Sequence, residues 1–292
     1  MHIELRQVSK RFGRSRALAD VDLTISSGAQ VALLGPNGSG KTTLTRAIMG
    51  LIRYDGEIRI DGRPLTERMS VASRLAYVPQ IAPQLGATVD EVLGAVSDLR
   101  GLARSTVVEL AAELGLDVDQ VRRRSLRGLS GGMRQKLLIA LALATPAELL
   151  ILDEPTASLD AAARARFLER VANQRGVTLL LCSHRLDELR ALVDHVVALD
   201  DGQVAYDGPA TTYLAARQAA VIELHHRGED GGWLAAHGFA RGAGGWWSRV
   251  VSQADKLELL PAALAALGAA IDDVVVRDSD RLELEVAGVG QA

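Results

Sequence analysis

A glycine-rich stretch near the N-terminus has the residue types needed to bind phosphate. Residues 35–42 read GPNGSGKT and match the pattern GxxxxGK[ST], after the apolar run QVALLG and before a helix-like segment. Glycines let the backbone wrap closely around an anion, and N–H groups at a helix start point toward it. Lys41 would bring positive charge to the β- and γ-phosphates, and Thr42 a ligand for Mg²⁺. The predicted phosphate-loop contacts are Gly35, Asn37, Gly38, Ser39, Gly40, Lys41, Thr42 and Thr43.

Two adjacent carboxylates end a second apolar run. The segment ELLILDEP places Asp153 and Glu154 where a buried strand would meet a loop. Two acids are costly there unless a cation or a proton transfer uses them. We expect Asp153 to hold Mg²⁺ through water, and Glu154 to polarise the attacking water as general base or positioner. A solvated acidic pair is the plain alternative, which the phosphate loop in the same chain disfavours.

A second helix start has the features of an anion site. The segment LSGGMRQ, residues 129–135, precedes an apolar helix, with Ser130 as the predicted N-cap. Gly131 and Gly132 leave room for a ligand to approach the backbone closely. A flexible linker is the alternative, but an apolar helix follows at once. The chain thus carries two anion-binding helix starts, with Ser130 88 positions after Thr42.

These motifs, in this order, resemble the ATPase subunit of an ATP-binding cassette (ABC) transporter. GPNGSGKTT, LSGGMRQ and LLILDEP match that family's phosphate loop, signature and acidic strand, and the resemblance covers about residues 1–215. It implies that Gln80 in YVPQ contacts Mg²⁺ or water and the membrane partner, and that His184 in LLLCSH lies near the γ-phosphate. It also implies that Phe12 stacks on adenine. Taken alone, these three residues would be a loop amide, a strand-end histidine and a core or surface aromatic.

The resemblance also implies partners. One chain holds one copy of each motif, so a complete ATP sandwich needs a second copy of this chain or a related cassette. Asp160 in SLD would belong to the loop that crosses to that cassette. An integral membrane permease, encoded separately, would place the chain at the cytoplasmic face of the cell's inner membrane. The signature residues assigned to nucleotide binding are Ser130, Gly131, Gly132 and Gln135.

Because Glu154 and His184 are both present, we expect an active ATPase that uses ATP and Mg²⁺. A soluble ABC-type ATPase of translation or DNA repair is the alternative. Family members in translation usually carry two cassettes in one chain, whereas this chain has one. The repair type inserts long coiled coils between the phosphate loop and the signature, and this interval leaves no room for them.

The elements that must position these residues follow from hydrophobic periodicity. Strands alternating with helices predict a parallel sheet core, and the half-buried strands at 2–8 and 20–26 predict an antiparallel β subdomain. We therefore expect an α/β fold, a P-loop NTPase of the ABC type with a helical insert at about 85–130. Further predicted strands are 30–35, 57–64, 74–79, 148–154 and 177–184; predicted helices are 42–50, 131–144, 161–175 and 185–193; and a hairpin turns at Asp201-Gly202.

The amino-acid composition limits which classes of function are possible. The 292 residues are 48% apolar and 24% charged, as in a globular protein with a substantial core, and the net charge of −3 argues against a nucleic-acid partner. The single cysteine, Cys182, fits a reducing compartment and is interpreted as a buried apolar residue. Neither a signal peptide nor an apolar stretch long enough to span a bilayer is evident.

Residues 216–292 are interpreted as a small C-terminal α+β domain, with a helix at 254–268 among short strands. They weakly resemble the C-terminal domain of bacterial cassette ATPases that serve exporters, one subset of which supports copper-site assembly of nitrous oxide reductase. That role is retained as an alternative cargo function. Adjacent strand residues point to opposite faces, so His225-His226 would make a poor metal chelate, and Trp246-Trp247 would contribute packing.

Overall fold

The computed structural model describes residues 1–65, 71–217, 219–228 and 231–278. The chain divides into two compact units. The first comprises Met1–His184 and Glu188–Ala210, and the second comprises Arg185–Asp187 and Thr211–Ala292. The domain boundary predicted near residue 215 falls inside helix α9 (Ala210–Arg217) and stays a prediction.

The first unit is built on a six-stranded sheet in the order β10-β9-β3-β8-β7-β6. Strands β6, β7, β8, β3 and β9 run parallel, and β10 pairs antiparallel with β9. The parallel strands consist mostly of apolar residues, with polar ones confined to their ends, as a sheet covered on both faces requires. The strands are β3 (Gln30–Leu34), β6 (Leu75–Val78), β7 (Leu149–Asp153), β8 (Thr178–Cys182), β9 (His195–Asp200) and β10 (Gln203–Pro209).

A second, antiparallel sheet has the order β2-β1-β4-β5. Helix α1 (Lys41–Ile48) shares one hydrophobic core with both sheets, through buried Leu44, Ala47 and Ile48. The first hairpin extends further than its predicted alternation, and this extension makes Phe12 the last residue of β1. The strands are β1 (Ile3–Phe12), β2 (Ser15–Ile25), β4 (Asp55–Ile60) and β5 (Arg63–Pro64).

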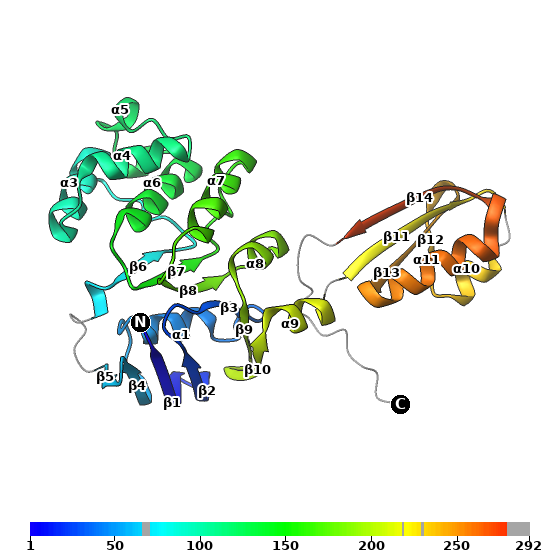
Figure 1. Ribbon diagram of the computed structural model, residues 1–292, viewed down its shortest axis with the longest axis horizontal. Coiled ribbons are helices and arrows are strands. Elements are labelled where there is room, and N and C mark those ends of the chain that lie inside the picture. The colour runs from blue at the N-terminus through cyan, green and yellow to red at the C-terminus, as the bar shows by residue number, and fades with distance from the viewer. Residues whose placement is uncertain (66–70, 218, 229–230, 279–292) are drawn as a thin grey trace. The chain divides into compact units, whose positions relative to one another are not determined.

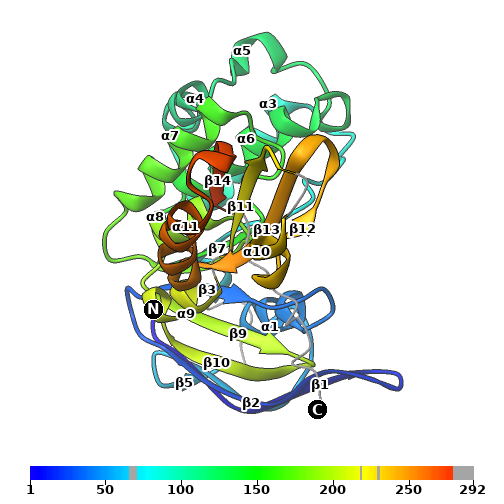
Figure 2. The same cartoon turned by 90° about the vertical axis from the view of Figure 1, so that its right-hand side faces the viewer.

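The predicted helical insert is confirmed. Its helices α3 (Val89–Arg100), α4 (Arg104–Glu113) and α5 (Val118–Val121) form a separate core with α6 (Gly131–Ala144). A capping box starts α3, because the Thr88 side chain accepts from the Glu91 N–H while the Glu91 carboxylate accepts from the Thr88 N–H. Within the first unit, these helices gather at the end opposite the antiparallel sheet (Figures 1 and 2).

The helices that follow β7 and β8 are α7 (Ala161–Ala172) and α8 (Leu186–Leu192). The predicted turn between β9 and β10 is present, since Asp201 and Gly202 both have positive φ, at 42° and 77°. Three short 3-10 turns cover Leu126–Gly128, Ala243–Gly245 and Gly268–Ala270.

The second unit is an α+β arrangement with sheet order β12-β13-β11-β14, all pairs antiparallel. Alternation on β11 buries Ile222, Leu224 and His226, while His225 on the other face lies near Asp272. The two histidines therefore face apart, as predicted for adjacent strand residues. The elements are β11 (Ala219–His226), α10 (Gly232–Ala236), β12 (Ala240–Arg241), β13 (Trp246–Ser252), α11 (Gln253–Leu267) and β14 (Ile271–Asp278).

Candidate functional site

The phosphate loop connects β3 to α1 and is shaped by its glycines. Gly35, Gly38 and Gly40 have φ of 143°, 87° and 104°, a region that disfavours other residues. At Gly40 a Cβ would also lie 2.5 Å from the Ala17 carbonyl oxygen. The Lys41 ammonium folds back over the loop, and its Nζ donates to the carbonyl oxygens of Gly35 at 2.6 Å and Pro36 at 2.9 Å. The loop thus encloses a cation in a narrow, backbone-lined turn.

The start of α1 is suited to an anion. Its N-cap residue is Gly40, and no side chain caps the helix. The Ser39 hydroxyl is buried in the loop and has no hydrogen-bond partner. Buried polar groups normally have partners, so an unpartnered hydroxyl beside an uncapped helix start indicates that a ligand completes the loop. The residues present therefore fit a phosphate chain.

The acidic strand β7 ends beside this loop and beside the end of β8, which His184 follows by two residues. The backbone N–H of Glu154 donates to the Cys182 carbonyl oxygen at 2.8 Å. This contact brings the Glu154 carboxylate toward the end of β8, where its Oε1 lies 3.3 Å from Nε2 of His184. Glu154 has φ of 44°, the only positive φ in the LLILDEP segment. The predicted acid and the predicted histidine are thus in contact.

The electrostatics of this region follow from burial. Burial first, then the Glu188 and Asp153 carboxylates, raise the pKa of Glu154 to about 7. Burial also raises the pKa of Asp153 above its ordinary value, while Lys41 opposes the shift. Burial lowers the pKa of Lys41, and the nearby Asp153 and Glu154 charges oppose that change. A carboxylate with a pKa near neutrality has the proton affinity expected of a general base.

The three predicted Mg²⁺ ligands come from neighbouring elements. Asp153 ends β7, Gln80 follows β6 by two residues, and Thr42 lies in the first turn of α1. Strands β6 and β7 are adjacent and parallel, so Gln80 and Asp153 leave the sheet at the same edge. The described residues contain no group of three or more His, Cys, Asp or Glu side chains able to hold a metal. A hydroxyl, an amide and one carboxylate are instead a donor set that suits Mg²⁺ together with phosphate oxygens and water.

The signature segment starts α6 in the predicted way. Ser130 is the N-cap, and its Oγ accepts from the Met133 N–H at 3.2 Å. Ser130 and Gly131 are exposed. A Cβ at Gly132 would lie 2.8 Å from the Ser158 carbonyl oxygen, so this glycine packs against the SLD segment of its own chain. The start of α6 therefore presents an exposed hydroxyl and exposed backbone at the surface of the first unit.

Asp160 also acts as an N-cap, here of α7, by accepting from the Ala163 N–H at 2.8 Å. Its other oxygen accepts from Nζ of Lys136 at 2.7 Å, and these hydrogen bonds lower the pKa of Asp160 to about 2. Asp160 thus attaches the SLD segment to both α6 and α7. Asp160, predicted to lie in the loop that crosses to the other cassette and to contact its nucleotide, thus also has a structural role that its sequence motif did not reveal.

Gln135 differs from the other signature residues because it is buried. Its Nε2 donates to two backbone carbonyl oxygens, of Pro155 at 3.1 Å and of Pro79 at 3.4 Å. Gln135 was predicted as a nucleotide contact. It lies about one turn beyond Gly131 along α6, where its side chain is buried inside the first unit.

The contact between Thr156 and Glu188 was not predicted from the sequence. Both side chains are buried, and the Thr156 hydroxyl donates to the Glu188 carboxylate. This contact connects the segment after Glu154 to helix α8, which follows His184. Glu188 stands four residues after His184, and an acidic residue on the inward face of a helix was the available signal.

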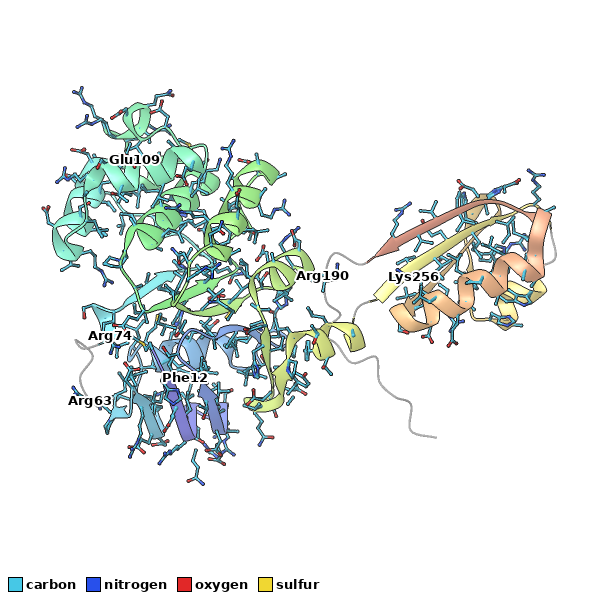
Figure 3. The ribbon with its side chains drawn as sticks, viewed as in Figure 1. Phe12, Arg63, Arg74, Glu109, Arg190 and Lys256 are labelled. Atoms are coloured by element: carbon cyan, nitrogen blue, oxygen red, sulfur yellow. The ribbon has the colours of Figure 1, made fainter. Side chains whose placement is uncertain are left out.

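Phe12 and Cys182 are the last two residues for which the sequence predicts a role. Phe12 is 52% exposed at the end of β1, with Nζ of Lys10 at 5.0 Å from its ring centre, and its position on the hairpin is labelled in Figure 3. An exposed ring can stack on a base. Cys182 is buried, and burial raises the pKa of its thiol far above the ordinary value. It is therefore an inert core residue, as expected.

Comparison with known proteins agrees with this geometry. The family model described as "ABC transporter" matches residues 18–157, which include the phosphate loop, Gln80, the signature and the acidic strand. The chain is 37% identical over 233 residues to the sulfate/thiosulfate import ATP-binding protein of Caulobacter vibrioides, covering 73% of this chain and 69% of that one. It is 36% identical over 229 residues to the daunorubicin/doxorubicin resistance ATP-binding protein of Streptomyces peucetius, covering 76% and 69%.

Among solved structures, the ATP-binding subunit of an ABC transporter has a TM-score of 0.66 and 28% identity, covering 73% of this chain and 92% of that one. In the part of the chain that the structure describes, none of the helices combines the length and apolar character needed to cross a membrane. The chain belongs to the ATP-binding subunits of ABC transporters, ATPases that power a membrane subunit.

Proposed function

We propose that this subunit hydrolyses ATP with Glu154 as the general base, in a site that its phosphate loop forms with the signature segment of a second cassette. The observation that carries the proposal is the contact between Glu154 and His184, whose Oε1 and Nε2 lie 3.3 Å apart. Lys41 interacts electrostatically with Glu154, so the contact lies beside the phosphate loop. A base and a charge-stabilising cation therefore meet where a terminal phosphate would end.

The phosphate loop binds the nucleotide. The uncapped start of α1 and the unpartnered Ser39 hydroxyl supply donors to the phosphates. Lys41 exchanges its bonds to the carbonyls of Gly35 and Pro36 for bonds to phosphate oxygens, which are charge-assisted and stronger. Phe12 contributes a ring face for the adenine base. The other donors are the backbone and side-chain groups of Asn37, Gly38, Gly40, Thr42 and Thr43.

Thr42, Asp153 and Gln80 would hold Mg²⁺, which would supply positive charge that offsets the negative charge of the phosphate oxygens. The charge of Asp153 acts on Lys41, so Asp153 lies near the phosphate loop. Binding of a cation lets Asp153 stay ionised although burial disfavours its charge. Gln80 is exposed beyond the end of β6, where it can also touch the membrane partner.

Glu154 takes the proton of the attacking water, and His184 orients Glu154 and the terminal phosphate. The setting that raises the pKa of Glu154 to about 7 also leaves only 19% of its side chain exposed, which limits its contact with bulk water. Positioning and charge stabilisation account for most of the catalysis of phosphoryl transfer. The chain contributes these through Lys41, Glu154 and His184.

A second cassette completes the site. In this chain, the phosphate loop and the exposed hydroxyl of Ser130 stand at the starts of two different helices. Two chains related by a twofold axis would each bring Ser130, Gly131 and Gly132 to the partner's phosphates. The second cassette is another copy of this chain or a related one. ATP favours the closed pair because both surfaces bind its phosphates, and hydrolysis removes that preference.

A membrane permease is the remaining partner, and it would hold this subunit at the cytoplasmic face of the cell membrane. The supporting observation is the set of exposed apolar side chains after Gln80, with Ile81 79% exposed and Leu85 45% exposed. Exposed apolar groups close together favour a protein contact. The relatives named above act in sulfate/thiosulfate import and in drug resistance, so the shared motifs serve more than one cargo.

Substitution Glu154→Gln tests the proposed function. The amide keeps the shape of the side chain but is no base, so we expect ATP turnover to fall by about 10²- to 10⁴-fold. ATP binding should persist, because the phosphate loop is untouched. Phosphate release measures turnover, and a fluorescent ATP analogue measures binding. Turnover at the wild-type rate would refute the assignment of Glu154.

The pH dependence of turnover gives a second test. Glu154 is active only when deprotonated, and its pKa is raised to about 7. The rate should therefore rise with pH up to about 7 and level off above it, losing about tenfold for each pH unit below. The residual rate of Glu154→Gln should lack this rise. A wild-type rate that stays constant from pH 5 to 7 would contradict the assignment.

A further inference from the structure

A single buried amide connects the two segments that leave the sheet at the proposed metal and base sites. Gln135 in α6 is 2% exposed, and its Nε2 donates to the Pro155 carbonyl oxygen at 3.1 Å and to the Pro79 carbonyl oxygen at 3.4 Å. Pro79 directly precedes Gln80, and Pro155 directly follows Glu154. The amide therefore joins the immediate neighbours of two proposed site residues.

The sheet does not hold these segments together at that point. The last paired residues of β6 and β7 are Val78 and Leu152. Beyond them the two segments are no longer paired with each other, although β7 stays paired with β8 through Asp153 and Cys182. Glu154 is held from the side of β8 by its N–H bond to the Cys182 carbonyl oxygen at 2.8 Å. Among the hydrogen bonds of the described residues, those of Gln135 tie the Gln80 side to the Glu154 side.

The chemistry of the side chain suits this task. A primary amide carries two N–H donors in one rigid plane, so it can serve two carbonyl oxygens at once. Each acceptor carbonyl belongs to a proline, whose ring fixes φ and stiffens the segment. A displacement of Pro79 would consequently be transmitted to Pro155 through the planar amide of Gln135. A buried apolar side chain of the same size would leave both carbonyl oxygens without this donor.

We propose that Gln135 is a positioning residue that holds the Gln80 segment in register with the Glu154 segment, and so transmits displacement of Gln80 to the base. The proposal rests on the roles proposed above for Gln80 and Glu154. Gln135 does not touch the nucleotide in this account, although it lies in the signature segment. It acts through the backbone on either side of the sheet edge, within one chain.

Substitution Gln135→Met in the full chain tests this proposal, because methionine keeps the length of the side chain and removes both donors. We expect kcat for ATP to fall about tenfold or more, since small displacements of a base are costly, with KM changed less than about twofold. Binding of a fluorescent ATP analogue without Mg²⁺ should be unchanged. The matched control is Ile139→Met, at a fully buried position of the same helix, which should keep the wild-type kcat.

Three results would overturn the proposal: a wild-type kcat in Gln135→Met, an increase confined to KM, or an equal loss of kcat in Ile139→Met. If Gln135→Met does not fold, Gln135→Asn takes its place, since it keeps the amide but reaches one methylene less far; a wild-type kcat there would likewise overturn the proposal. The result for Glu154→Gln in the same assay is independent. Wild-type turnover in that variant refutes the proposed base, whereas wild-type turnover in Gln135→Met alone refutes only the positioning role.

Discussion

The two glycine-rich helix starts in this chain are built differently. The N-cap of α1 is Gly40, with a φ of 104° and no side-chain cap, and the Ser39 hydroxyl beside it is buried without a partner. The N-cap of α6 is Ser130, whose Oγ accepts from the Met133 N–H at 3.2 Å. The first start leaves its donors for a ligand. The second start is already capped by its own side chain, and it presents an exposed serine at the surface.

The glycines of the two starts also serve different needs. At Gly40 a Cβ would lie 2.5 Å from the Ala17 carbonyl oxygen, and the backbone conformation itself excludes other residues. Gly132 has an ordinary helical backbone, but a Cβ there would lie 2.8 Å from the Ser158 carbonyl oxygen. One glycine shapes a ligand loop, and the other allows two segments of one chain to pack. Glycine is thus required for different physical reasons at Gly40 and at Gly132.

The largest expected difference between the two starts is in nucleotide affinity. Lys41→Ala removes the charge that the phosphate loop encloses, and we expect ATP binding to weaken by about 10- to 100-fold, as the loss of a charge-assisted hydrogen bond implies. Ser130→Ala should leave binding to the dilute, single chain unchanged, because its hydroxyl serves a different chain's nucleotide. Fluorescent ATP titrations without Mg²⁺ measure both. Equal losses in the two variants would remove the distinction between the two starts.

The next effect is on stability, and it should separate two adjacent glycines. Gly132→Ala forces a Cβ against the Ser158 carbonyl oxygen and should lower the free energy of unfolding by about 1–3 kcal/mol. At Gly131 the nearest atom to an added Cβ is the Ser158 Oγ at 4.0 Å. Gly131→Ala should therefore leave stability unchanged or raise it by up to about 1 kcal/mol. Urea unfolding measures both variants, and equal destabilisation would contradict the packing explanation.

A smaller loss of stability than that of Gly132→Ala is expected from the helix cap itself. Ser130→Ala removes the acceptor of the Met133 N–H and should cost about 1 kcal/mol. Ser130→Asp keeps a capping oxygen and should restore stability, while its negative charge should still impair ATP turnover across the proposed interface. Thermal unfolding and phosphate release separate the two roles. If Ser130→Asp recovered turnover together with stability, Ser130 would act only as a cap.

Much of the first unit could be predicted because its signals are local. The strand β3, the phosphate loop and α1 follow each other without interruption, and apolar runs marked β7 and β8. The family resemblance placed His184 near the γ-phosphate, in the same site as Glu154, but it did not predict their contact; 30 positions separate the two residues, and no local pattern joins them. The structure adds the hydrogen bond from the Glu154 N–H to Cys182 that brings them together.

What sequence could not predict depends on which side of an element is buried. Gln135 was grouped with its motif, yet its position on α6 makes it an internal donor to Pro79 and Pro155. The buried contact between Thr156 and Glu188 joins residues 32 positions apart, for which neither motif nor periodicity gave a partner. Polar residues inside a core are identified by their hydrogen-bond partners, and those partners become visible only in the folded chain.

The mass of the Glu154→Gln variant in solution tests the central claim most directly. A single chain has a mass of 31.1 kDa. If the two helix starts are complementary halves of a shared ATP site, light scattering should show twice this mass at saturating Mg-ATP and the single mass without nucleotide. Material that keeps the single-chain mass under saturating Mg-ATP, even after a related cassette and the membrane partner are supplied, would contradict the account.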